Sequence, residues 1–119
     1  MSPQNRRAHP RFRLHLSAEI QTPKRTITAA TRDLSVGGCC VESPYSLQEG
    51  LQIRLSLFLV IDGIECVETP PLIVGAQVQW TAENDEAPLE SRHLAGMRFT
   101  DATDAQRKWL EDFLARASG

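Results

Sequence analysis

The chain has 119 residues, of which 13 are basic and 15 acidic, and its formal net charge is −2. A chain of this length is expected to form one domain with a core that needs no disulfide or metal for stability. Its three cysteines, Cys39, Cys40 and Cys66, are odd in number and include no Cys-x-x-Cys pair, which argues against a disulfide scaffold. The three histidines show no ligand spacing, so we expect neither a metal site nor a cofactor.

No apolar segment is long enough to cross a membrane, which takes about 20 residues. The longest apolar run, residues 55–61, is interrupted by Ser56. The N-terminus has basic residues but no apolar stretch after them, unlike a signal peptide. We therefore predict a cytoplasmic protein without membrane insertion.

Charge is distributed unevenly along the chain. Residues 1–25 contain six basic side chains and one acidic side chain, a net charge of +5, which leaves −7 for the remaining 94 residues. A basic arm on an acidic body favours a compact anionic ligand over a nucleic-acid polymer, because a polymer needs a basic face across the whole domain.

Residues 1–13 form the predicted arm, which we expect to be flexible. Pro10 removes one backbone amide and restricts His9 to extended conformations, so Arg7 and Arg11 should not share a helical face despite their spacing. Residues 14–119 form the predicted domain.

Alternation of apolar and polar residues, β-branched residues and turn signals together predict a series of strands in this domain. They cover residues 14–21, 25–34, 39–42, 51–61, 64–68, 72–80 and 92–100. Asp62-Gly63 indicates a tight hairpin turn, and Trp80 falls on the apolar face of its strand. On strand 39–42, Cys39 and Cys40 should point to opposite faces. Such a series predicts a mainly β domain.

A helix is predicted over about residues 103–117. Thr103-Asp104-Ala105-Gln106 has the pattern of a capping box. The apolar residues that follow form one stripe, Trp109, Leu110, Phe113 and Leu114, which should pack on the sheet.

The segment Asp33-Leu34-Ser35-Val36-Gly37-Gly38 combines hydrogen-bonding groups with backbone that a ligand could approach. A carboxylate accepts several hydrogen bonds, a hydroxyl donates or accepts, and glycines permit positive φ and lack a Cβ. The same residues also suit an ordinary turn at the end of a strand.

Together with Arg7 and Arg11, this segment resembles the signature of the PilZ family, Arg-x-x-x-Arg followed by Asp/Asn-x-Ser-x-x-Gly. Gly96-Met97-Arg98-Phe99 is similar to the Gly-x-x-Phe of the last PilZ strand. The resemblance implies a six- to seven-stranded antiparallel β-barrel with a C-terminal α-helix packed on it. It also implies a stand-alone receptor for the second messenger cyclic di-GMP, which signals by conformational change to an unknown protein effector as a monomer or homodimer.

The resemblance also implies the site. The arginines would bind guanine edges and phosphates, Asp33 would accept from guanine N–H groups, Ser35 would bind the ligand or hold the turn, and Gly38 would leave room for a base. Arg6 could stack on a second ligand molecule. The predicted ligand-binding residues are Arg6, Arg7, Arg11, Asp33, Ser35, Gly37 and Gly38.

The main alternative is a PilZ-fold adaptor that binds no nucleotide, as in pilus or motility assembly. A barrel for single-stranded nucleic acid would need stacking aromatics on a basic open face. An enzyme is not expected, because the sequence has no Gly-x-Ser-x-Gly, no paired carboxylate motif and no histidine at a recognisable offset from Ser35.

Overall fold

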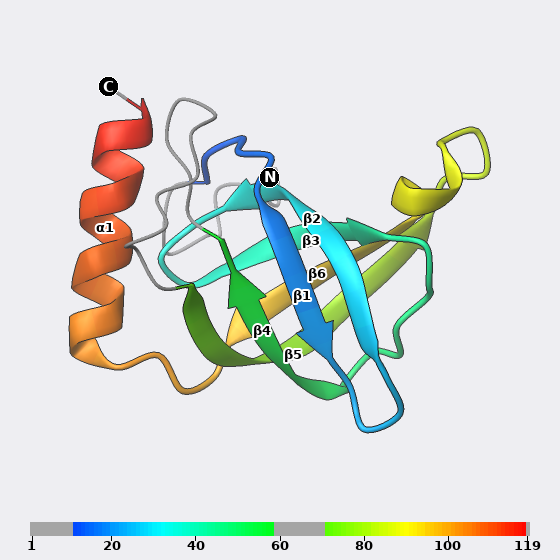
Figure 1. Cartoon of the computed structure of the whole chain (residues 1–119), viewed down its shortest axis with the longest axis horizontal. Coiled ribbons are helices and arrows are strands. Elements are labelled where there is room, and N and C mark those ends of the chain that lie inside the picture. The colour runs from blue at the N-terminus through cyan, green and yellow to red at the C-terminus, as the bar shows by residue number, and fades with distance from the viewer. Residues whose placement is uncertain (1–10, 59–70, 119) are drawn as a thin grey trace, which may run out of the picture.

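Six antiparallel strands close into a barrel in the order β1-β2-β3-β6-β5-β4, and helix α1 lies beside one end of it (Figure 1). This computed structural model describes residues 11–58 and 71–118. The elements are β1 (Ser17–Gln21), β2 (Thr26–Leu34), β3 (Gly38–Ser43), β4 (Gln52–Leu57), β5 (Leu72–Glu83), a short 3-10 turn η2 (Leu89–Ser91), β6 (His93–Phe99) and α1 (Asp104–Ser118). The predicted barrel and C-terminal helix are confirmed. The predicted turn at Asp62-Gly63, the strand 64–68 and Cys66 lie outside the described residues.

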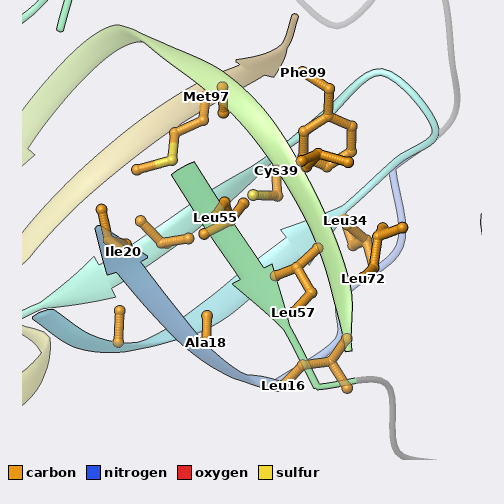
Figure 2. Packing of buried hydrophobic residues seen from close by; sticks show 14 of the residues in the cluster. Leu16, Ala18, Ile20, Leu34, Cys39, Leu55, Leu57, Leu72, Met97 and Phe99 are labelled. Atoms are coloured by element: carbon orange, nitrogen blue, oxygen red, sulfur yellow. The ribbon is translucent and has the colours of Figure 1, made fainter. Parts of the chain in front are cut away.

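Apart from Trp80, the alternating side chains of β4 and β5 that the pattern places inside help to fill the barrel interior. On β4, Ile53, Leu55 and Leu57 are buried, while Gln52 and Arg54 are exposed. Figure 2 shows leucines, Cys39, Met97 and Phe99 from different strands packed together inside the barrel. Burial of this apolar surface, at about 25 cal/mol per Å², is the main contribution to stability.

Helix α1 begins with the predicted capping box. The hydroxyl of Thr103 accepts from the Gln106 amide at 3.1 Å, and the Gln106 side chain accepts from the Thr103 amide at 2.9 Å. Its apolar stripe belongs to the barrel core, since Leu110, Phe113 and Leu114 are all buried there. The helix therefore covers one end of the barrel.

Two β-bulges change the direction of side chains near the ends of β2 and β5. The register shifts between Thr31 and Asp33 on β2 and between Val78 and Trp80 on β5. Each extra residue reverses the alternation of inward and outward side chains. Without the bulges, Asp33 and Trp80 would continue the inward-facing positions of β2 and β5; with them, both side chains point outward. The prediction that Trp80 faces the core is wrong, because its side chain is 42% exposed.

The chain on the N-terminal side of β1 is joined to β2. Phe12 and Leu34 exchange two backbone hydrogen bonds of 2.9 Å, and the buried Thr31 hydroxyl accepts from the Leu16 amide at 2.8 Å and donates to the Leu14 carbonyl. Residues 11–13 were assigned to the flexible arm by sequence. In the structure this segment is held at the end of β2, where Phe12 pairs with Leu34.

Candidate functional site

Ser35 holds the turn between β2 and β3. Its amide donates to the Gly38 carbonyl at 2.8 Å, and its hydroxyl donates to the same oxygen at 3.1 Å. The amides of Gly37 and Gly38 in turn donate to the hydroxyl at 3.3 and 3.2 Å. Because Ser35 is 4% exposed and bonded on all these sides, its contribution is to shape the turn.

Arg11 and Asp33 meet where the N-terminal segment joins β2. The Arg11 Nη1 and Asp33 Oδ1 atoms are 2.7 Å apart, and both side chains are about one quarter exposed, at 24% and 26%. The neighbouring Phe12–Leu34 bridge brings the arginine to this place. A carboxylate offers further acceptor positions, so Asp33 can bind a ligand N–H group while it orients Arg11.

Asp33 and Trp80 end one row of residues that crosses four strands on the outside of the barrel. Asp33 pairs with Cys40, Cys40 with Gly96, and Gly96 with Trp80. The two bulges lie on β2 and β5, the strands that flank the β3–β6 pair, and together they place a carboxylate and an indole at the two ends of this row.

Two glycines in this region lie so close to a neighbouring group that a Cβ would not fit. A Cβ on Gly96 would lie 2.0 Å from Nε1 of Trp80, so the indole rests directly on this glycine. A Cβ on Gly38 would lie 2.1 Å from the Met97 carbonyl oxygen. The requirement for glycine at position 38 thus comes from the backbone of β6. Of the described glycines only Gly50 has a positive φ, so Gly37 and Gly38 do not use that freedom.

A cavity of about 450 Å³ lies over this region. Arg11 and the Ser35–Gly38 turn contribute one part of its lining, and Trp80, Gln79 and Arg98 contribute another. The guanidinium of Arg98 donates to the Gln77 side chain at 3.3 Å. The cavity combines an aromatic face, two guanidinium groups and glycine backbone, which suits a planar, anionic ligand.

Cys40 lies beneath this surface. It faces away from the barrel core, as the alternation predicts, yet it is only 4% exposed, and Cys39 is fully buried inside. Burial, followed by the nearby Asp33 carboxylate, raises the pKa of the Cys40 thiol to about 11. Burial also raises the pKa of Cys39. Both thiols are therefore protonated at neutral pH and suit packing rather than nucleophilic chemistry.

The structure brings together most of the residues that the sequence singled out. Arg11, Ser35, Gly37 and Gly38 line the cavity. Asp33 is not part of the lining but is paired with Arg11, which is. Arg6 and Arg7 lie outside the described residues.

Sequence reasoning missed Gln79, Trp80 and Arg98. The alternation on β6 could have shown that Arg98 points outward between the buried Met97 and Phe99. No sequence signal marks the bulge that moves Trp80.

Among the described residues, the hydrogen-bond partners of Ser35 include no catalytic side chain. The Ser35 hydroxyl bonds only to backbone groups, without a histidine or carboxylate partner. Within residues 11–58 and 71–118, no group of three or more His, Cys, Asp or Glu side chains could hold a metal ion. No helix in this part of the chain is long and apolar enough to cross a membrane.

The fold and cavity define a class: a small closed β-barrel with a ligand-sized hollow at its rim. Within that class, the PilZ domain family matches residues 5–116, and the chain belongs to this family. No curated protein sequence matches the chain significantly.

Several solved structures have a similar fold, including the following three. The Bacillus subtilis inhibitor of motility MotI (DgrA) has a TM-score of 0.74 at 19% identity, covering 98% of this chain and 55% of that one. The PilZ domain of Escherichia coli YcgR, solved with cyclic di-GMP, has a TM-score of 0.74 at 15% identity, covering 95% and 92%. The Klebsiella pneumoniae MrkH complex with cyclic di-GMP has a TM-score of 0.70 at 20% identity, covering 93% and 51%. The chain thus spans about half the length of MotI and MrkH.

Proposed function

We propose that this PilZ domain is a cyclic di-GMP receptor whose binding site is the cavity beside the β2–β3 turn. The observation that carries the proposal is the Arg11–Asp33 pair at a cavity that also has Trp80 in its lining. The YcgR domain and MrkH, which share the fold, were solved with this ligand. The proposal extends their ligand to this chain on the chemistry of its own residues.

The charged groups match the polar edges of the ligand. A guanidinium donates two parallel hydrogen bonds to guanine O6 and N7 or to a phosphate, a role that we assign to Arg11 and Arg7. Asp33 accepts from guanine N1–H and N2–H, a donor pair that adenine lacks. Trp80 offers a face on which a base can stack. In this proposal Ser35, Gly37 and Gly38 shape the turn, and Arg6 stacks on a second ligand molecule if two bind.

Isothermal titration of the protein with cyclic di-GMP tests the proposal. We expect saturable heat at micromolar or lower ligand and none with cyclic di-AMP. Loss of one charge-assisted contact costs about 1.5 to 3 kcal/mol, so Arg7→Ala and Arg11→Ala should each weaken binding roughly ten- to a hundredfold. Arg13→Ala is the matched control, since Arg13 is an exposed arginine of the same segment and does not line the cavity.

The stoichiometry of the titration tests Arg6. Two ligands per protomer, reduced to one in Arg6→Ala, would support the stacking role, and one ligand in the unaltered protein would refute it. No heat from a folded protein would overturn the receptor proposal and favour an adaptor that binds no nucleotide. A search for a protein effector would then be the next experiment.

A further inference from the structure

A second hollow, of about 340 Å³, lies between the β1–β2 turn and the connection from β3 to β4. Figure 1 shows the β1–β2 turn on the side of the barrel away from α1. The lining is apolar at Ile27, Leu47 and Leu51, and it includes the basic residues Lys24 and Arg25. No residue of this hollow lines the candidate nucleotide site.

Both segments that form the hollow are held by hydrogen bonds within the segment. The Thr22 hydroxyl donates to the Arg25 carbonyl at 3.0 Å and accepts from the amides of Lys24 and Arg25. The hydroxyl of the buried Ser43 donates to the Tyr45 carbonyl at 2.8 Å. A surface that is already ordered loses little conformational entropy when a partner binds.

Tyr45 and Arg25, which both line the hollow, are residue types typical of protein–protein interfaces. Tyr45 is 46% exposed, and the Arg25 guanidinium carbon lies 4.6 Å from the centroid of its ring. Tyrosine and arginine are enriched among the residues that dominate binding energy at interfaces. Among the described residues, neither Lys24 nor Arg25 has an acidic side chain within ion-pair distance.

The complementary surface is present on the same chain, in the connection between β5 and β6. Leu89 is 61% exposed, more than any other large apolar side chain described. Asp85, Glu86 and Glu90 flank it, all exposed and none within ion-pair distance of a described basic residue. This connection therefore offers one apolar side chain with acidic neighbours, and the hollow offers apolar walls with basic neighbours.

We propose that two copies of this chain associate by these surfaces, with Leu89 of one copy in the Tyr45–Arg25 hollow of the other. The acidic neighbours of Leu89 then face Lys24 and Arg25. Because the two surfaces differ, a two-fold axis gives two equal contacts in a closed dimer, whereas other arrangements repeat head to tail into a larger ring or an open chain. A contact carried largely by surface charges weakens with salt, since screening acts over about 8 Å at physiological ionic strength.

Sedimentation velocity of the full chain, over about a hundredfold range of protein concentration, measures this association. We expect the mass to rise from 13.3 kDa toward twice that value, and the rise to diminish in high salt. Two charge-reversal variants supply the test: Lys24→Glu with Arg25→Glu in the hollow, and Glu86→Arg with Glu90→Arg in the acidic connection. Each variant alone should remain monomeric, because both of its contacts pair like charges.

An equimolar mixture of the two variants should associate again, because one contact of the mixed dimer has the original charges and the other has both reversed. Lys108→Glu, an exposed reversal on α1, is the control and should associate like the unaltered chain. A mass that stays at the monomer value throughout would overturn the proposal, as would association that persists in both charge variants. Failure of the mixture to associate would also overturn it.

Discussion

At the scale of single residues, the position of Trp80 depends on a β-bulge and on a glycine neighbour. Its indole rests on Gly96, where any Cβ would overlap it, and it borders the cavity that also contains Arg11. Trp80 is not part of the barrel core, and its indole packs on the backbone of Gly96 on the outer face. In the proposed function, its exposed face is available for a base to stack on.

Replacing Trp80 by alanine should weaken cyclic di-GMP binding without unfolding the barrel. A lost base stack costs about 1 to 3 kcal/mol, roughly five- to a hundredfold in affinity, and Trp80→Phe should lose less. Gly96→Ala should also weaken binding, since it retains the indole but displaces it. Titration calorimetry measures each affinity. Tyr45→Ala removes a similarly exposed aromatic outside the cavity and should bind normally; equal losses in both would contradict the stacking role.

Because of Cys40, the free energy of unfolding should vary with pH in the alkaline range. The pKa of Cys40 is raised from 9.0 to about 11 in the folded protein, so between these values the unfolded state loses a proton that the folded state keeps. The unfolding free energy should be unaffected by this group below pH 9 and fall as pH rises from 9 to 11. Urea unfolding at several pH values should show a shallower fall in Cys40→Ala than in the unaltered protein. Identical slopes would show that Cys40 does not contribute.

At the scale of elements, the sequence predicts which segments form strands better than where their side chains point. Alternation located β1, β4, β5 and β6 because mainly one face of each of these strands is buried, and the capping box located the start of α1. Strand β3 is buried on both faces, so alternation does not mark it. Alternation failed at Trp80 because the bulge beside this residue is a property of the β5–β6 pairing. The bulge beside Asp33 depends in the same way on the pairing of β2 with β3.

The capping box of α1 can be tested by removing its hydroxyl. Thr103→Ala leaves the Gln106 amide without its 3.1 Å acceptor and should lower the unfolding free energy by about 1 kcal/mol. Thr103→Ser keeps the hydroxyl and should retain most of that energy. Urea unfolding compares the three proteins. If serine were as destabilising as alanine, the threonine methyl group, and not the hydrogen bond of the cap, would account for the stabilisation.

At the scale of the whole molecule, the site combines local and distant residues. The turn residues Ser35, Gly37 and Gly38 are close in sequence, so a short motif can place them together. Arg98 and Trp80 reach the same cavity only because β3, β6 and β5 are neighbours in the barrel. A linear pattern cannot show this unless the strand order is known.

Phe12 ties the N-terminal segment to the barrel, so truncations on either side of Phe12 should differ in stability. A chain that begins at residue 11 keeps the Phe12–Leu34 bridge, and one that begins at residue 14 loses its two hydrogen bonds and the packing of Phe12 on the core. At about 0.5 to 1.5 kcal/mol per hydrogen bond, the shorter chain should be less stable by about 1 to 3 kcal/mol. The longer one should match the full chain in urea unfolding but bind cyclic di-GMP at least tenfold more weakly, because it lacks Arg7. Equal stability of the two truncations would place the domain boundary at residue 14, with residues 11–13 outside the folding unit.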